Sequence, residues 1–257
     1  VLHAFGAADF SPEMLLLVPL GFIFAFGAYL ITFAITPRTK REDRAFYLLN
    51  GCGFNLGCFA LPFVQAIFSP TMAVATCLYD AGNAFMMAGG SYALTGLIAG
   101  GKRIEHPVRF VAKRLFSSLP FDTYLLIIVL SVAGVRLPAE LVAFTEPIAN
   151  ANSFLAMFML GLMMSFSVSR ERMAKVARLV GLRAAFSVLL TCIVWLVLPV
   201  DGVMRALLTL LVWSPASALG PMYTQMSGGD GGLAGFANAL TIILGVVAAT
   251  FIALTLV

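Results

Sequence analysis

Two apolar stretches of the chain, residues 45–68 and 203–226, are each interrupted by small and polar residues that lead up to a proline. A proline inside a helix removes one backbone donor and displaces the carbonyl one turn earlier. In lipid such freed groups are costly, so they must face protein or a wet cavity. The half-helices on either side offer partial charges, an N-terminus to a carboxylate and a C-terminus to a cation. We therefore expect a substrate site at the two breaks: Asn55, Gly57, Pro62, Ser214, Pro215, Ser217, Pro221 and Tyr223.

One acidic residue, Asp80, lies well inside an apolar stretch, and Asn83 follows it on the same helical face. A charge at mid-membrane costs on the order of 2.5–3.5 kcal/mol on insertion scales, so Asp80 needs a partner or a task. One interpretation is a proton or cation site, formed by Asp80 and Asn83, that couples transport to an ion gradient. The other is an aspartate near the outer end of its helix that is hydrated or caps a broken turn. The two breaks also have an alternative interpretation without a substrate site, because Gly53 and Gly57 would suit close helix packing.

The sequence contains no nucleophile–base pairing, zinc-ligand spacing or phosphate-binding loop. We therefore expect no catalytic residue, no metal site and no cofactor. The four cysteines lie inside apolar stretches without metal-type spacing, so buried packing is their expected role. The 16 basic and 12 acidic residues give a net charge of +4, but the basic residues form short clusters between apolar stretches. Such clusters indicate membrane topology, and no nucleic acid partner is expected.

Most of this surface must face lipid, because 61% of the residues are hydrophobic, only 11% are charged, and the mean hydropathy is +0.99. A soluble domain carries about 25% charged residues. A membrane span needs about 20 mostly apolar residues, and we expect an all-α membrane protein. Eight apolar stretches, bounded by proline and glycine, are its predicted helices: Glu13–Ile35, Ala45–Phe68, Thr71–Ile98, Leu119–Val135, Leu141–Phe166, Val180–Pro199, Val203–Met226 and Leu233–Val257.

Basic residues cluster after the first, third and fifth of these stretches and are rare in the other connections. Short cytoplasmic loops carry an excess of Lys and Arg, so the first stretch is expected to enter from outside. The amphipathic segment 106–118 is expected to lie along the cytoplasmic surface. The stretch 71–98 is longer than a perpendicular span requires and should tilt, break or begin at the interface. The predicted location is the cell membrane (inner or plasma), with several passes through the lipid.

The two interrupted stretches begin alike, with Arg44-Ala-Phe-Tyr-Leu-Leu and Arg205-Ala-Leu-Leu-Thr-Leu. By the charge pattern the first runs outward and the second inward. Similar units inserted in opposite senses are typical of an inverted-repeat transporter. The expected organisation is a first repeat over residues 1–98, a cytoplasmic connection over 99–118, and a second repeat over 119–257.

Several motifs resemble the auxin efflux carrier family of bacterial and plant membrane transporters, and the resemblance runs through nearly the whole chain. It implies ten helices in two inverted repeats of five, with the fourth and ninth helices broken and crossing, an architecture similar to that of bile-acid-type sodium symporters. It also implies transport of small organic anions such as malonate, malate or auxin. The matching segments are Gly53-Phe-Asn-Leu-Gly-Cys-Phe-Ala-Leu-Pro62, Leu78-Tyr-Asp-Ala-Gly-Asn83, Leu155-Ala-Met-Phe-Met-Leu-Gly-Leu162 and Ser214-Pro-Ala-Ser-Ala-Leu-Gly-Pro-Met-Tyr223.

The chain departs from that pattern because three predicted helices, rather than five, precede the amphipathic segment. Either two further helices precede Val1, which we expect because the chain does not begin with Met, or the chain is a shortened relative. A homodimer is also expected.

The predicted function is secondary transport of small organic anions by alternating access, coupled to H⁺ or Na⁺. Two alternatives are an intramembrane enzyme, which would need a catalytic dyad, and a structural or sensory subunit, which would not require two opposed breaks. Arg44 and Arg205 stand at helix starts, and no Lys or Arg is expected deeper in the spans. The anion would then be held by backbone N–H groups and polar side chains alone, which favours monovalent or singly protonated species.

Overall fold

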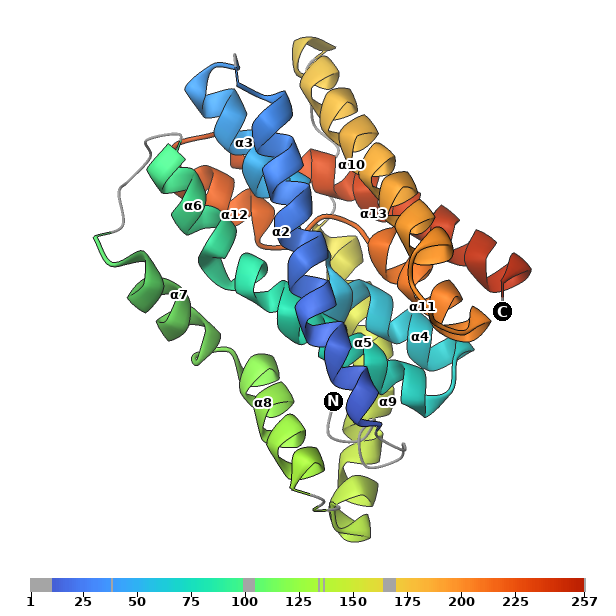
Figure 1. Cartoon of the computed structure of the whole chain (residues 1–257). Coiled ribbons are helices and arrows are strands. Elements are labelled where there is room, and N and C mark those ends of the chain that lie inside the picture. Colours follow the sequence, from blue (N-terminus) through green and yellow to red (C-terminus); the bar gives the residue numbers. More distant parts are fainter. Residues whose placement is uncertain are drawn as a thin grey trace.

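The computed structural model describes residues 11–37, 39–98, 105–133, 135, 137–163 and 170–256. Helices make up 83% of it and the described residues contain no strand, which confirms the predicted all-α class. Segments from both halves of the chain pack into one bundle, with α7 and α8 along one side of it (Figure 1). Residues 1–10, the basic pair Lys102 and Arg103, and the predicted helix end at Phe166 lie outside the described residues.

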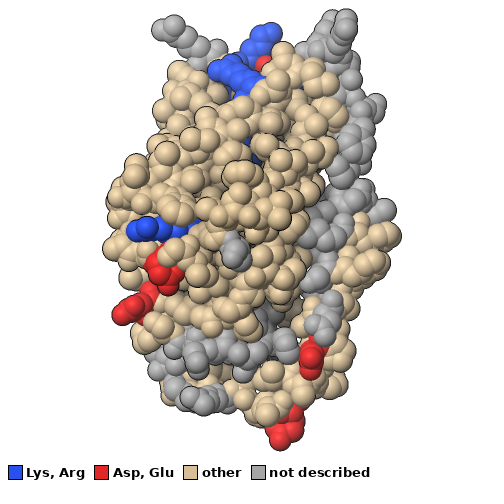
Figure 2. All heavy atoms as spheres, turned by 90° about the vertical axis from the view of Figure 1, so that its right-hand side faces the viewer, with Lys and Arg blue, Asp and Glu red and all other residues tan. Residues whose placement is uncertain are grey.

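Within the described ranges, three helical segments are long and apolar enough to cross a membrane: Pro12–Ile35, Arg172–Leu196 and Gly231–Thr255. A fourth candidate consists of Arg41–Gly51 and Leu56–Ile67, which are bent by 43° at a short break. Figure 2 shows a face on which the described residues are mostly uncharged, with most of the Lys, Arg, Asp and Glu side chains among them at the margins. These features indicate a membrane protein, because a surface in lipid must be apolar.

The helical segments follow the apolar stretches, and proline or glycine stands at many of their ends. Two segments, η2 and η3, are π-helical turns between α-helices. The bounds are η1 Pro12–Leu16, α2 Leu17–Ile35, α3 Arg41–Gly51, η2 Leu56–Ala60, α4 Leu61–Ile67, α5 Pro70–Phe85, η3 Met86–Gly90, α6 Ser91–Ile98, α7 Pro107–Leu115, α8 Leu119–Val132, α9 Ala139–Met163, α10 Arg170–Leu196, α11 Gly202–Val212, α12 Gly220–Met226 and α13 Gly231–Thr255.

The helix predicted over Val180–Pro199 differs most from the structure, because α10 already begins at Arg170. Its first turns carry strong helix formers such as Arg, Glu, Met, Ala and Lys, and they project beyond the apolar part of the helix. An apolar-run criterion misses such turns, since they contain the charged residues that end the run. Residues expected in the first turn of this helix therefore lie near the middle of α10.

Two close contacts join α2 to α5, which pack along much of their length. A Cβ atom added at Gly21 would overlap the carbonyl oxygen of Tyr79, and one added at Gly82 would overlap that of Val18. Small residues at these positions therefore let the two backbones approach closely, as in many membrane helix pairs. This pair supports the part of the core that surrounds the first helix break.

The long stretch 71–98 is broken rather than continuous. After α5, the turn η3 contains Gly89 with φ of 141°, and α6 starts at Ser91. Residues other than glycine rarely adopt this backbone conformation, and a Cβ at Gly89 would also press against the ring of Phe110 in α7. Glycine at this position therefore permits both the kink and the close approach of α7.

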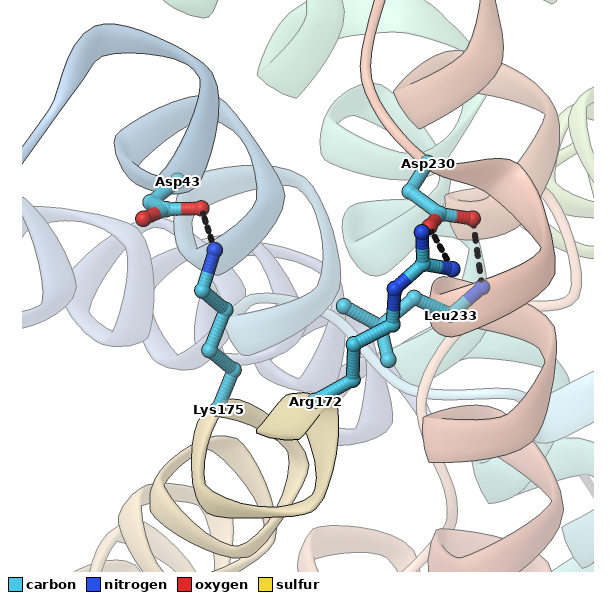
Figure 3. A network of polar contacts seen from close by, with 5 residues as sticks. All are labelled: Asp43, Arg172, Lys175, Asp230 and Leu233. Atoms are coloured by element: carbon cyan, nitrogen blue, oxygen red, sulfur yellow. Dashed lines mark hydrogen bonds and ion pairs between the residues drawn. The ribbon is translucent and has the colours of Figure 1, made fainter. Parts of the chain in front are cut away.

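The starts of α3, α10 and α13 meet at one end of the bundle, where two ion pairs join them (Figure 3). Lys175 of α10 binds Asp43 of α3, and Arg172 of α10 binds Asp230 at a distance of 2.6 Å. Asp230 also caps α13 by accepting a hydrogen bond from the backbone N–H of Leu233. Two basic clusters that lie far apart in the sequence therefore gather at the same end of the molecule.

Candidate functional site

The first helix break comprises Cys52 to Asn55, between α3 and η2. Gly53 has φ of +68°, and a Cβ there would overlap the side chain of Met87, so the turn requires glycine. The side chain of Asn83 satisfies the buried backbone of Phe54, which lies outside the helices. Its Oδ1 accepts from the Phe54 N–H at 3.1 Å, and its Nδ2 donates to the Phe54 carbonyl at 2.9 Å. Asn83 thus takes the place of a missing helical turn.

The break precedes Pro62 and lies within the small and polar residues that lead up to this proline. Helical structure is continuous from Leu56 to Ile67, and Pro62 stands in the first turn of α4. The preceding turn, η2, is π-helical. A wider turn of this kind relieves the clash between a proline ring and the carbonyl one turn earlier.

The second break runs from Trp213 to Leu219, between α11 and α12, and Pro221 stands in the first turn of α12. Side chains again satisfy the backbone, because the N–H of Ala216 donates to Oγ1 of Thr241 in α13 at 3.1 Å. Ser214 and Ser217 make local bonds. The hydroxyl of Ser214 donates to the carbonyl of Leu210, and that of Ser217 accepts from the N–H of Leu219.

The two breaks are in direct contact. The backbone N–H of Asn55 donates to the carbonyl of Pro215 at 3.0 Å. In the neighbouring half-helices, Nδ2 of Asn50 donates to Oγ1 of Thr224 at 2.8 Å. The start of α3 and the residues just after α12 line one cavity of about 250 Å³, so α3 and α12 lie side by side in opposite directions.

A buried arginine, Arg183, binds both breaks at once. Its Nη1 donates to the carbonyl of Asn50, the next-to-last residue of α3, at 3.2 Å. Its Nη2 donates to the carbonyl of Ser214, just beyond α11, at 3.1 Å. The expectation that no Lys or Arg lies deep in the spans is therefore wrong, because Arg183 is the central residue of α10 and only 6% exposed. The sequence did contain a signal, since Arg183 interrupts an apolar stretch as Asp80 does.

Polar residues continue along α10 at intervals of four, which places them on one face of the helix. Ser187 donates its hydroxyl to the carbonyl of Val212 at 2.7 Å. Further along, the indole N–H of Trp213 donates to Thr191 at 3.1 Å, and the indole N–H of Trp195 donates to Thr209 at 3.0 Å. Together with Arg183, these bonds hold the carbonyl end of α11 against α10.

Asp80 lies beside the first break, on α5. Its carboxylate accepts hydrogen bonds from Nδ2 of Asn83 and from the hydroxyl of Tyr124, each at 3.0 Å. A Cβ added at Gly57 would lie 3.6 Å from Oδ2 of Asp80, an ordinary contact distance, so Gly57 lies next to the carboxylate. Tyr124 belongs to α8 and is 4% exposed. Tyr124 could not be predicted as a partner of Asp80, because a tyrosine in an apolar stretch has no local pattern that identifies its partner.

Asn55 is 7% exposed, and its Nδ2 atom has no hydrogen-bond partner in the described part of the chain. Buried donors are nearly always paired, so this amide is a candidate contact for a ligand. Tyr223, by contrast, stacks on Tyr92 of α6, with ring centroids 5.2 Å apart. The structure thus brings Asn55, Pro215 and the backbone of Ser214 together at the contact of the two breaks. It places Gly57 with Asp80 and Asn83 beside that contact.

No group of three or more His, Cys, Asp and Glu residues among the described residues could hold a metal ion. Cys52 and Cys77 are buried and free, whereas Cys192 is exposed. No protein-family model matches the chain, and no curated protein matches it. The function must therefore be inferred from these residues and their geometry.

Proposed function

We propose that this chain is a secondary transporter that moves small organic anions across the cell membrane by alternating access. The observation that supports it most directly is the hydrogen bond between Asn55 and Pro215, which joins two helix breaks. Irregular backbone at membrane depth is tolerated where it is buried in protein or lines a wet cavity. Transporters with inverted repeats place substrate and coupling-ion sites at such discontinuous helices.

Helices α3 and α12, one from each broken segment, lie side by side in opposite directions, and this arrangement supports an inverted repeat. The first segment runs from α3 to α4, and the second runs from α11 to α12. In the proposed transporter they belong to opposed repeats of a multi-pass fold like that of the auxin efflux carriers, whose motifs the sequence resembles. A structural subunit would not require two such breaks in contact.

We call the contact between the two breaks, at Asn55 and Pro215, the crossing. The hydrogen-bond donors there favour an anionic substrate. The Asn55 amide has no partner among the described residues, and the guanidinium of Arg183 binds the carbonyls beside both breaks. Amide and guanidinium N–H groups are suited to a carboxylate. Asp80 lies next to the crossing and accepts bonds from Asn83 and Tyr124, so it is the proposed site for the coupling proton or cation.

An intramembrane enzyme would need a nucleophile paired with a base in a cavity. The acidic residue next to the two breaks is Asp80, and the hydroxyl of Tyr124 donates a hydrogen bond to it. In the described part of the chain no serine, threonine or cysteine donates a hydrogen bond to Asp80, so its carboxylate is paired with no nucleophile of these usual types. Transport therefore explains the site with fewer additional groups.

The test is uptake by proteoliposomes that contain the purified full chain. Labelled mono- and dicarboxylates, including malonate, malate and indole-3-acetate, are offered while a proton gradient and then a sodium gradient is applied. We expect accumulation of at least one carboxylate above protein-free vesicles, and dependence on one of the two gradients. Well-folded protein that neither binds nor transports any of these anions would contradict the proposed function.

A further inference from the structure

Arg183 is a buried cation without a carboxylate partner among the described residues. The ion pairs found there are Arg172–Asp230 and Lys175–Asp43, both at the end of the bundle. A guanidinium has five N–H donors, and two of those of Arg183 bind carbonyl oxygens. Buried charges in proteins are normally paired or bound to a ligand. The site around Arg183 is therefore incomplete as an electrostatic arrangement.

The carbonyls that hold Arg183 fix its position at the crossing. The C-terminal end of a helix carries about half a negative charge, and Arg183 lies at the ends of both α3 and α11. These partial charges stabilise the guanidinium, but they are spread over the last helical turn. Loss of either contact would remove the guanidinium from the carbonyl of Asn50 or of Ser214, so Arg183 cannot leave this position without giving up both hydrogen bonds.

A second donor lies on the same break. The guanidinium carbon of Arg183 is 5.8 Å from the ring centroid of Phe54, and Asn55 follows directly in the chain. The Nδ2 atom of Asn55 is buried and lacks a partner among the residues that the structure describes. An anion bound at this break would meet a fixed positive charge and an amide donor, the combination that recognises a carboxylate.

We propose that Arg183 makes the crossing selective for anions, by supplying the positive charge that balances one substrate carboxylate. This inference rests on the proposed transport function. One fixed cation matches one carboxylate, so a monoanion, or a dicarboxylate that retains one proton, is the preferred species. A cationic or uncharged analogue of the same shape gains nothing from Arg183.

The test compares binding of a carboxylate with binding of its uncharged amide. The first pair is malonate and malonamide, and the second is the carboxylate with the highest uptake in the vesicle panel and its amide. Arg183→Gln should weaken carboxylate binding by roughly 30-fold or more, the loss typical of truncating a buried charge pair, and should leave amide binding within about twofold. Arg183→Lys keeps the charge and should retain the preference for the carboxylate. Arg178→Gln, on the exposed part of the same helix, is the matched control and should bind both compounds like the wild type.

A role limited to capping the two helix ends predicts a different result. Arg183→Lys and Arg183→Gln would then weaken the binding of both compounds alike, and that outcome overturns the proposal. A preserved preference for the carboxylate in Arg183→Gln overturns it as well. If the wild type binds no carboxylate at all, the transport function itself fails instead. Should Arg183→Gln not fold, the side-chain NMR signal of ¹⁵N-labelled Arg183, assigned with Arg183→Lys, provides a second measurement. It should shift on adding the carboxylate and not the amide, and an unshifted signal with bound carboxylate also overturns the proposal.

Discussion

The backbone N–H of Asn55 lies 3.0 Å from the carbonyl oxygen of Pro215 and donates a hydrogen bond to it. The two residues belong to opposite halves of the chain, and each stands in the break of a helical segment. A displacement of one break must therefore either move the other with it or break this bond. Arg183 adds a second link, because it binds the carbonyls beside both breaks. The crossing is thus a natural point at which substrate binding could affect both halves of the protein.

The side chains of Asn55 and Asn50 should respond differently to replacement by alanine. Asn50 donates to the carbonyl of Phe46 and to Thr224, so Asn50→Ala should lower the unfolding free energy by about 1–3 kcal/mol. Asn55 offers an unpartnered amide, so Asn55→Ala should leave stability nearly unchanged while weakening carboxylate binding by roughly tenfold. Thermal unfolding in detergent and equilibrium binding measure the two effects. A large loss of stability in Asn55→Ala with unchanged binding would assign the amide to packing.

Two glycines of the α2–α5 region provide a test of the packing. Gly82→Ala would place a Cβ onto the carbonyl of Val18, and we expect a loss of about 1–3 kcal/mol from overpacking. Gly27→Ala is the matched control, since a Cβ there meets no atom within 4 Å. It should be neutral or stabilising by about 0.5–1 kcal/mol, because alanine favours the helix. The stability of the two variants is compared by unfolding in detergent. Equal stability would show that α2 and α5 pack less closely than in the structure.

Much of the fold follows from the sequence because apolar length determines where helices form in a membrane protein. The predicted all-α class is confirmed, and prolines and glycines mark many of the helix ends. The position of the first break could not be derived from Pro62. It depends on Gly53, which adopts φ of +68°, and on Asn83, which satisfies the backbone of Phe54 from another helix. Long-range partners of this kind have no local sequence signal.

The candidate site could be predicted only in part, for a similar reason. Asp80 and Asn55 are visible as polar residues in apolar stretches, but their surroundings are contributed by other helices. Tyr124 reaches Asp80 from α8, and Arg183 reaches the breaks from α10. Arg183 was missed because the predicted helix began at Val180, three residues before it, whereas α10 begins at Arg170 and buries Arg183.

Asp230 combines two roles that substitutions should separate. It caps α13 and pairs with Arg172, although both side chains of the ion pair are more than a third exposed. Asp230→Ala should therefore cost about 1 kcal/mol, mainly from the lost cap, whereas Asp230→Ser keeps a capping oxygen and should cost much less. Asp201→Ala, which removes the cap of α11, is a matched comparison. If Asp230→Ser is as unstable as Asp230→Ala in thermal unfolding, the ion pair rather than the cap stabilises this end.

Asp80 should be essential for coupling and dispensable for folding. Asp80→Asn removes the charge while nearly keeping the shape, and its amide can still accept from Asn83 or from the hydroxyl of Tyr124. Gradient-driven accumulation of the carboxylate should then fall by roughly tenfold or more, the factor that corresponds to about 1.4 kcal/mol. Exchange of substrate down its own gradient should partly survive, because the crossing at Asn55 and Pro215 stays intact. Both rates are measured in proteoliposomes at equal protein content.

Tyr124→Phe provides the graded comparison for this experiment. It deletes one hydrogen bond to the carboxylate and leaves the charge of Asp80 in place, so accumulation should be reduced less than in Asp80→Asn. A coupling role for Asp80 requires this order of effects, with exchange changing less than accumulation in both variants. If Asp80→Asn accumulates substrate like the wild type, Asp80 is a packing residue, satisfied by Asn83 and Tyr124. If both variants lose exchange and accumulation equally, the carboxylate maintains the shape of the first break. Asp80 would then hold the side chain of Asn83, which in turn positions the backbone of Phe54.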